Sequence, residues 1–393
     1  MSAPKPPAGH FTLLYFAAAT SYTRKQYDFL AAPMPVNDLY AHLEKLYPGI
    51  RAKVLDSSAL TVNLDYVDLE EEAGKGDSGM SIQSGDEVAV IPPVSSGTMT
   101  SPQPKTIIYK TVGKVEIPFD LYLPSNAKNV PVLLWFHGGG LLQGIRNSVS
   151  PHMLRAVETY NLALVSADYR LAPQVGVAEI YEDVKEAAAF IRDGRLVQQV
   201  GNGILDTSRL AVSGSSAGGY LAFLAGLYLE PKPKVILPIY PITDPLGTFF
   251  TTSQPHPFGG ERTDPSTLAE FIDPSAEVAV NNPTESKRNG MYFYMMQEAN
   301  LAELLRMKPG DDTFRVGKKI YERGLPPCYV VHGDADSAVG VEQADEVVGV
   351  MYGLKKERGL VVEYERLRGV NHLFDREEKV ELKWMYEFLM RYL

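Results

Sequence analysis

The sequence predicts an α/β fold, in which helices flank a mostly parallel sheet, preceded by a small α+β domain. Three observations predict it. Apolar runs typical of buried strands alternate with helix-like segments from residue 106 onward, and this alternation builds mostly parallel sheets. The glycine-rich turn at residues 214–219 lies between one such run and an alanine-rich, helix-like segment. The first hundred residues follow a different order, ββαββ, which is typical of a separate α+β domain.

The first domain is expected over residues 1–97. Its helix begins near Asn37 or Asp38, either of which can cap it, and ends before Pro48. One face of this helix is apolar and consists of Leu39, Leu43 and Leu46. Strands are expected at residues 10–18, 21–29, 60–69 and 87–94. The acidic, Gly- and Ser-rich stretch from Glu70 to Gly85 is expected to be a solvated loop.

Most of residues 10–97 resembles the β-grasp (ubiquitin-like) sulfur carriers, specifically the small subunit of molybdopterin synthase. The sharpest matches are Leu13–Ala17 and residues 85–97, GDEVAVIPPVSSG. In that family the domain ends in Gly-Gly, and its terminal carboxylate is adenylated and then carries sulfur as a thiocarboxylate. The resemblance implies a partner, the molybdopterin synthase large subunit, and a carrier terminus at Gly97.

The chain departs from that pattern at the tail. Ser96 stands in place of the penultimate glycine, and Gly97 is followed by a second domain. A glycine inside a chain has no free carboxylate and cannot be activated. Three alternatives stay open: cleavage after Gly97, a first domain that only binds, or two neighbouring genes joined in one reading. Residues 98–105 are rich in Ser and Pro, as expected of an interdomain linker.

The second domain is expected over residues 106–393. Residues 107–123 are expected to form an opening hairpin. Further strands are expected at 130–136, 162–168, 209–212, 234–240, 328–331 and 360–367. Between Asp244 and Pro326 the rhythm breaks, and a segment at about 245–326 is expected to cap the mouth of the site. The Met and aromatic run 291–296 within it is interpreted as helical core rather than a substrate-lining surface.

The pattern Gly214-x-Ser216-x-Gly218 is typical of a sharp strand-to-helix turn that exposes one serine hydroxyl. Glycines on both sides remove Cβ atoms that would collide in such a turn. An inert Gly- and Ser-rich loop has the same composition. A base and an acid that could activate the serine therefore decide between the two interpretations. Of the 7 His, only His372 lies beyond the last strand-like run, and Asp336 precedes it. The order Ser, Asp, His, each after a strand, indicates a nucleophile with its acid and base.

From about residue 106 onward the chain resembles the α/β-hydrolase family, in the branch related to hormone-sensitive lipase. The matching pieces are HGGG at 137–140, DYRLAP at 168–173, GSSAGG at 214–219 and the C-terminal Asp and His. The resemblance implies an esterase-like serine hydrolase, in which Asp336 rather than Asp334 is the acid. The implied catalytic residues are Ser216, Asp336 and His372, and the implied oxyanion donors are the N–H groups of Gly138, Gly139 and Ala217.

Two positions depart from this branch. Ser215 stands where the branch more often has Asp, and the acid lies in a Gly-x-x-Asp-x-x-Val setting that is more similar to the prolyl-oligopeptidase side of the superfamily. Within the DYRLAP piece, Asp168 and Arg170 are interpreted as an ion pair or turn with a structural role.

The composition and charge of the chain exclude several classes of binding partner. The net charge of −10 argues against nucleic acid or an anionic membrane. The single cysteine, Cys328, falls in an expected strand and is interpreted as a core residue. No Cys/His cluster suggests a metal, no cofactor is implied, and no segment is typical of a signal peptide or a membrane span. A cytoplasmic location is therefore expected.

The predicted function is hydrolysis of a small-molecule ester through an acyl-enzyme. A peptidase or an acyltransferase is a near variant of this prediction. Two alternatives belong to other classes. One is a non-catalytic ligand receptor on a hydrolase fold, and the other is a sulfur carrier for molybdenum cofactor synthesis, which requires a free terminus at Gly97.

Overall fold

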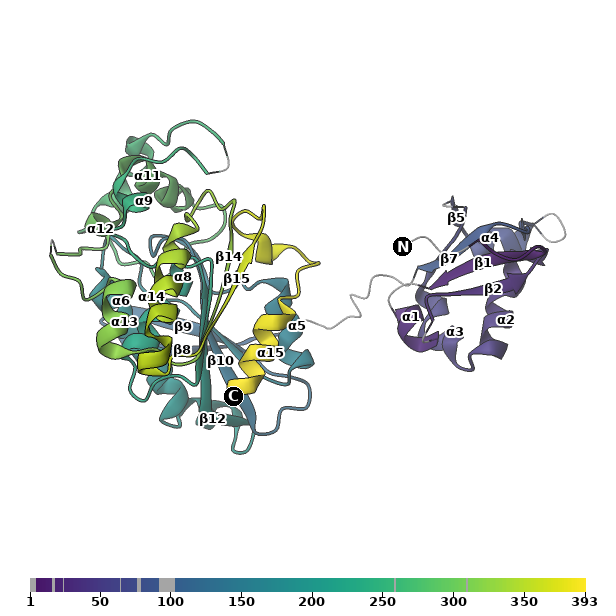
Figure 1. Cartoon of the computed structure of the whole chain (residues 1–393), viewed down its shortest axis with the longest axis horizontal. Coiled ribbons are helices and arrows are strands. Elements are labelled where there is room, and N and C mark those ends of the chain that lie inside the picture. The colour runs from purple at the N-terminus through teal and green to yellow at the C-terminus, as the bar shows by residue number, and fades with distance from the viewer. Residues whose placement is uncertain are drawn as a thin grey trace. The chain divides into compact units, whose positions relative to one another are not determined.

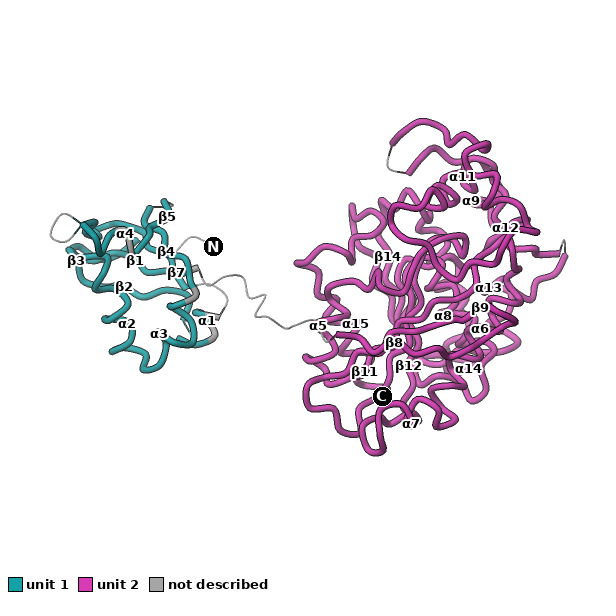
Figure 2. The backbone as a smooth tube through the Cα atoms, turned by 180° about the vertical axis from the view of Figure 1, so that it is seen from behind, with its two compact units in different colours: residues 1–101 teal, residues 102–393 magenta. Residues whose placement is uncertain are grey.

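The computed structural model describes residues 5–15, 18–23, 25–63, 65–75, 79–91, 103–257, 259–308 and 310–393. The chain divides into two compact units, Met1–Ser101 and Pro102–Leu393 (Figure 2). Each unit has its own hydrophobic core. The segment that contains Gly97 lies outside the described residues, as does most of the expected linker.

The first unit contains a five-stranded sheet in the order β2-β1-β7-β4-β5. Its strands are β1 (His10–Tyr15), β2 (Tyr27–Ala31), β4 (Ala59–Val62), β5 (Asp65–Val67) and β7 (Glu87–Ile91). The first and last strands, β1 and β7, pair in parallel at its centre, and the other pairs are antiparallel. Helix α2 (Leu39–Leu46) packs on this sheet through Leu39 and Leu43, which are fully buried. The expected β-grasp arrangement is therefore confirmed.

Three local predictions for this unit are wrong. Residues 18–23 form helix α1 (Ala18–Thr23) instead of the start of a strand, and the Thr23 hydroxyl donates to the Ala19 carbonyl within it. The expected strand 60–69 is a hairpin of β4 and β5 that turns at Asn63, whose φ is 50°. The expected loop 70–85 contains helix α4 (Leu69–Gly74) and β6 (Ser81–Ile82), which pairs with β3 (Met34–Pro35). A short helix, α3 (Ile50–Lys53), follows α2.

The second unit contains an eight-stranded sheet in the order β15-β14-β13-β12-β10-β11-β9-β8. Its strands are β8 (Lys105–Val112), β9 (Val115–Tyr122), β10 (Val130–Phe136), β11 (Ala163–Ala167), β12 (Leu205–Ser215), β13 (Val235–Ile239), β14 (Cys328–Gly333) and β15 (Val362–Leu367). The six strands β15, β14, β13, β12, β10 and β11 are parallel, whereas β9 pairs antiparallel with both β11 and β8. The sheet expected from the sequence is confirmed.

Helices cover both faces of this sheet (Figure 1). One face packs against α6 (Val177–Arg192), α8 (Ala217–Tyr228), α13 (Val316–Arg323) and α14 (Glu342–Arg358). The other face packs against α5 (Pro151–Thr159) and α15 (Lys383–Tyr392). Alternate residues of β10 serve the two cores, because successive side chains of a strand point to opposite faces. A short helix, α7 (Arg195–Val200), follows α6.

The segment between β13 and β14 is built from short helices: α9 (Thr248–Thr251), α10 (Ala269–Ile272), α11 (Met291–Glu298) and α12 (Leu301–Leu304). In Figure 1, α9, α11 and α12 lie together at one end of the unit. The Met and aromatic run forms α11, and Met291 and Met295 are fully buried in the core. The interpretation of this run as helical core is confirmed for these two residues, but it is wrong for Tyr292 and Phe293, which line the cavity that Ser216 faces.

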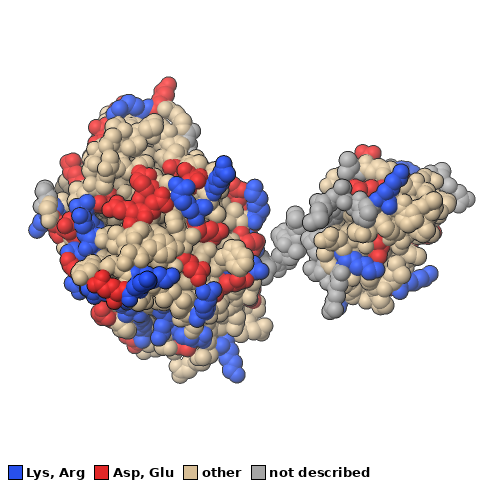
Figure 3. Space-filling view, in the orientation of Figure 1, with Lys and Arg blue, Asp and Glu red and all other residues tan. Residues whose placement is uncertain are grey.

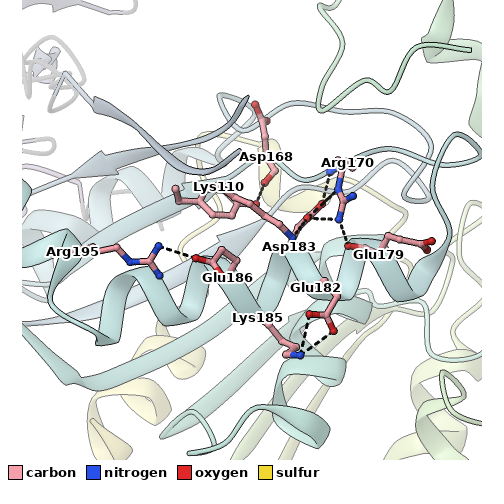
Figure 4. Close-up of polar contacts among 10 residues, drawn as sticks. Lys110, Asp168, Arg170, Glu179, Glu182, Asp183, Lys185, Glu186 and Arg195 are labelled. Carbon is pink, nitrogen blue, oxygen red and sulfur yellow. Dashed lines mark hydrogen bonds and ion pairs between the residues drawn. The ribbon is translucent and has the colours of Figure 1, made fainter. Parts of the chain in front are cut away.

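Asp168 and Arg170 form separate ion pairs rather than one with each other. The guanidinium of Arg170 contacts the buried carboxylate of Asp183 on α6 at 2.8 Å, and Lys110 contacts the same carboxylate at 2.6 Å (Figure 4). Asp168 accepts from Arg146 at 2.7 Å. Both residues therefore have a structural role. Asp168 acts beside the glycine turn, and Arg170 acts between a strand and a helix.

Acidic and basic side chains are interspersed on the face of the molecule that Figure 3 shows. Within the described ranges, no helix has both the length and the apolar character that crossing a membrane requires.

Candidate active site

Ser216 lies at the junction of β12 and α8 with φ 58° and ψ −118°, a conformation that is rare for any residue except glycine. Its glycine neighbours make the turn possible. A Cβ atom on Gly214 would overlap the carbonyl of Gly218, and one on Gly218 would overlap the carbonyl of Phe136. The turn therefore tolerates no side chain at either position, as the sequence pattern predicts.

The backbone of the turn is fixed by hydrogen bonds. The Ser216 N–H donates to the Ile239 carbonyl of the neighbouring strand at 2.8 Å. Its carbonyl accepts from Tyr220 at 3.2 Å and from Ile242 at 3.3 Å. The side chain is only 3% exposed and faces a cavity. The strained conformation thus aims one hydroxyl into a confined space.

An imidazole and a carboxylate meet beside this cavity, each from the loop that follows a parallel strand. His372, after β15, donates through Nδ1 to Oδ2 of Asp336, after β14, at 2.6 Å. The other carboxylate oxygen of Asp336 accepts the N–H groups of Ala338 at 2.9 Å and Val339 at 2.8 Å. Asp336 is therefore held in place by its own loop.

The alternative acid, Asp334, serves a different purpose. Its carboxylate accepts from the Arg366 guanidinium at 2.8 Å and from the Gly369 N–H at 2.6 Å. Although the two aspartates are two residues apart, the structure brings Asp336 and not Asp334 to His372.

A second histidine, His332, also contacts the carboxylate of Asp336. Its Nε2 lies 3.2 Å from Oδ2 of Asp336 and donates to the Val339 carbonyl at 2.9 Å. Burial by itself would raise the pKa of Asp336, but the hydrogen bonds from His332 and His372 hold that pKa well below its usual range. The carboxylate thus stays ionised beside the imidazole. No sequence pattern assigned a role to His332.

Asn371 joins the loop of the acid to the loop of the imidazole. Its side-chain oxygen accepts the Ser337 N–H at 3.0 Å and the His372 N–H at 2.7 Å. Sequence reasoning missed this residue, and its place directly before the histidine is the only signal that could have indicated it.

The glycine turn after β10 lies alongside Ser216. A Cβ atom placed on Gly138 would stand 3.1 Å from the Cβ of Ser216, so only a glycine allows this approach without displacement. Gly139 has φ 105°, a left-handed value that favours glycine. Within the described part of the chain, the N–H groups of Gly138 and Gly139 have no hydrogen-bond partner. Ala217 begins α8, so its N–H is among those that a helix leaves unpaired.

These groups line one cavity of about 370 Å³. Ser216, His372, Gly138 and Gly139 lie on its wall. The segment between β13 and β14 contributes Asn282, Thr284, Asn289, Tyr292 and Phe293. In the described residues, the Ser216 hydroxyl makes no hydrogen bond to His372. Such bonds are often long or misaligned without substrate and tighten when one binds.

A buried carboxylate, Asp375, lies behind the cavity wall. It accepts hydroxyl groups from Tyr240, from Ser150 at 2.8 Å and from Ser215 at 3.3 Å. His152 approaches it at 3.8 Å. Burial alone would raise the pKa of Asp375, but the nearby His152 and the hydroxyl groups of Tyr240 and Ser150 hold that pKa below its usual range.

This carboxylate is linked to the imidazole, because the ring of Tyr240 packs 4.4 Å from the ring of His372. We name Asp375, Tyr240, Ser150, Ser215 and His152 the Asp375 cluster. No sequence pattern indicated it. Its members come from four separate segments, since Ser150 and His152 both lie at the start of α5, so only the folded chain brings them together.

No group of three or more His, Cys, Asp or Glu side chains in the described ranges is placed to hold a metal ion. Cys328 is fully buried in β14, and burial raises the pKa of its thiol. The interpretation of this cysteine as a core residue is confirmed.

Two families match separate parts of the chain. A family described as alpha/beta hydrolase fold matches residues 133–376. The ThiS family matches residues 13–97. The two matched regions fall in the two compact units.

Among known proteins, the molybdopterin synthase sulfur carrier subunit of Pyrenophora tritici-repentis (strain Pt-1C-BFP) is 54% identical over 97 residues, which are 25% of this chain and 100% of the relative. The non-reducing polyketide synthase Preu6 of Preussia isomera is 26% identical over 326 residues, which are 74% of this chain and 15% of the synthase.

Solved structures share the fold of the larger unit. A protein with unknown function from Staphylococcus aureus subsp. aureus Mu50 has a TM-score of 0.59 at 20% identity and covers 73% of this chain and 99% of its own. Esterase LipW from Mycobacterium marinum has a TM-score of 0.52 at 19% identity and covers 73% of this chain and 80% of its own. At these identities the likeness concerns the fold alone.

Proposed function

Because the chain belongs to the alpha/beta hydrolase fold family and begins with a domain of the molybdopterin synthase sulfur carrier family, we propose that residues 106–393 form a serine esterase. The enzyme acts on small-molecule esters through an acyl-enzyme. The observation that carries the proposal is the 2.6 Å hydrogen bond between His372 and Asp336 at the cavity onto which the strained Ser216 opens.

In this mechanism the Ser216 hydroxyl attacks the ester carbonyl, and Nε2 of His372 takes its proton. Asp336 holds the Nδ1–H and stabilises the imidazolium that forms. The negative charge on the carbonyl oxygen is received by the N–H groups of Gly138, Gly139 and Ala217. His372 then protonates the departing alcohol, and a water molecule releases the acyl group by the same route.

Two measurements on the purified full-length chain test this proposal. A fluorophosphonate probe, which reacts with serines activated by a base, should label the chain, and a short-chain 4-nitrophenyl ester should be hydrolysed. Ser216→Ala should abolish labelling and lower kcat by about 10⁴-fold or more. The matched control is Ser208→Ala, which removes an exposed hydroxyl on the same strand and should change neither readout.

Persistence of turnover or labelling in Ser216→Ala would assign the activity to another group. If the unaltered chain takes no label and cleaves no ester, the proposal fails, and a receptor that binds a ligand in the same cavity becomes the better explanation. A peptidase would take the label but cleave amides in preference to esters. An acyltransferase would take the label but transfer the acyl group to a second alcohol in preference to water.

A second function is favoured by the 54% identity of the first unit to a sulfur carrier subunit over that relative's whole length. We propose that the first unit binds the molybdopterin synthase large subunit, and that it carries sulfur only where the chain ends at Gly97. The sulfur carrier role requires this end because the thiocarboxylate forms on a terminal carboxylate.

Fluorophosphonate labelling of an extract from the source cells, separated by size, distinguishes the arrangements. A labelled band at 43.3 kDa means that the hydrolase is active within the undivided chain. A shorter labelled band, together with a small fragment that ends at Gly97, means that the units act separately. The mass of that fragment should rise when sulfur replaces one oxygen of its carboxylate. A fragment that ends elsewhere would contradict the carrier role.

A further inference from the structure

Arg376 is the one permanently charged residue among those that line the described cavity. It ends the short helical turn Phe374–Arg376, four positions after His372. The described lining contains no Asp, Glu or Lys, and its other polar members are neutral serines, amides, a threonine, tyrosines and His372. The lining of the cavity that faces Ser216 therefore bears one positive charge and no carboxylate, although the whole chain carries −10.

The guanidinium of Arg376 has no ion pair or side-chain hydrogen bond within the described residues. Its charge nevertheless reaches inward. Burial lowers the pKa of His137, which lies behind the glycine turn, and the positive charge of Arg376 lowers that pKa further. Two other arginines of this unit do form ion pairs: Arg170 with Asp183 and Arg315 with Asp244.

No described side chain accepts a hydrogen bond from this guanidinium, and several polar oxygens of the cavity accept from other groups. The Asn282 oxygen accepts the Gly144 N–H at 2.7 Å, and the Asn289 oxygen accepts from Asn282 at 2.8 Å. The carboxylate of Asp375, next to Arg376 in the sequence, is fully buried and accepts hydroxyl groups. An acceptor for the guanidinium must therefore come from solvent or from a ligand.

We propose that Arg376 selects esters that carry a second, ionised carboxylate, which binds its guanidinium while the ester carbonyl lies at Ser216. This inference rests on the proposed function and names its substrate class. A guanidinium holds a carboxylate through two parallel hydrogen bonds, which gives both affinity and orientation. Arg376 is an exposed residue, so salt screens such a pair in part, and the preference should weaken as ionic strength rises. Esters with a cationic group are disfavoured by the same charge.

A matched pair of esters tests the proposal: 4-acetoxybenzoate, which is anionic, and its methyl ester, which is neutral. Their dissociation constants are measured by calorimetry with full-length Ser216→Ala, which binds without turnover. We expect the anionic ester to bind about ten-fold more tightly than the neutral one. Adding Arg376→Gln should remove this preference. Adding Arg368→Gln, an exposed arginine outside the cavity lining, should keep it.

Loss of the preference in Arg376→Gln alone supports the proposal, and a preference that is absent or survives this substitution overturns it. Arg376→Lys, which keeps the charge but not the two parallel donors, should restore part of the preference. Hydrolysis of the methyl ester by the unaltered chain is measured separately. If the methyl ester is hydrolysed but Arg376→Gln leaves the ratio of the two dissociation constants unchanged, the proposed preference for anionic esters is wrong and the esterase function stands. If neither ester is hydrolysed, the proposed function fails, while the binding ratio still decides the role of Arg376.

Discussion

Ser216 adopts its conformation because residues without side chains stand on both sides of it. Gly218 belongs to the first turn of α8 and lies against the carbonyl of Phe136 at the end of β10. The sheet, the turn and the helix are thus in contact at the Cα atom of Gly218. Any side chain there must push a strand and a helix apart.

We therefore expect Gly218→Ala to destabilise the second unit by about 3 kcal/mol or more. The control is Gly349→Ala in α14, where an added Cβ meets nothing within 4 Å, so it should stabilise the helix by about 0.5–1 kcal/mol. Urea unfolding followed by tryptophan fluorescence measures both. Both tryptophans, Trp135 and Trp384, lie in the second unit, so the signal reports that unit alone. Equal effects of the two variants would contradict the steric argument.

Asp375 gives a prediction about pH. Its pKa is lower in the folded state than the value of about 3.9 in an unfolded chain, so the unfolded chain takes up the proton first as the pH falls. The stability that this carboxylate contributes is present above about pH 4 and is lost as the pH falls through the folded-state pKa. The pKa of Asp336 is also lowered in the folded state, so its contribution to stability is lost in the same direction as the pH falls.

Asp375→Asn should lower the free energy of unfolding by about 3 kcal/mol at pH 7, because hydroxyl donors lose a charged acceptor. The free energy of unfolding should also fall less steeply between about pH 5 and 2 than in the unaltered chain. The control, Tyr240→Phe, removes one donor and should cost about 1 kcal/mol. Fluorescence-monitored urea unfolding at several pH values checks this. A slope unchanged by Asp375→Asn would contradict the ionised state of this carboxylate.

At the level of elements, the candidate site depends on two loops that follow neighbouring parallel strands, β14 and β15. Parallel strands end at the same edge of a sheet, so the acid and the imidazole meet there. Asn371 ties the two loops together through its side chain, and Tyr292 of α11 holds the loop of the acid by donating to the Ala338 carbonyl at 2.6 Å. The position of the imidazole is thus set by contacts outside the reacting groups.

Asn371→Ala should lower kcat by about ten-fold with little change in KM, because a small displacement of His372 slows the proton transfer. The stability of the second unit should change by about 1 kcal/mol at most, since the side chain is exposed. Asn371→Asp keeps an oxygen at the same place and should restore most of the activity. If both variants are equally impaired, the tie has no role in positioning the imidazole.

At the scale of the whole molecule, two units with separate cores share one chain. The domain boundaries at 97 and 106 remain a prediction from the sequence, and limited proteolysis tests them. We expect brief protease treatment to cut first within residues 98–105 and to leave two fragments that resist further cleavage. The larger fragment should keep the ester hydrolysis and the unfolding midpoint of the full chain. An early cut inside residues 106–393 would contradict these boundaries.

The sequence by itself determined the order of strands and helices in the second unit, the turn at Ser216 and the two family resemblances. These follow from short-range causes. Apolar runs specify buried strands, and glycines permit a turn that other residues forbid. The errors in the first unit arose where short elements lack such patterns. Residues 18–23 are a single turn of helix that tertiary contacts and two threonine hydroxyls stabilise.

The tertiary structure decided what lies next to what. Asp334 and Asp336 look alike in sequence, but their side chains go to Arg366 and His372 because the loop turns between them. The Asp375 cluster joins segments as far apart as Ser150 and Asp375, and among the described residues no carboxylate pairs with Arg376. A hydrogen bond between residues far apart in the chain leaves no periodic trace in the sequence. Only the packing of strands and loops brings such partners together.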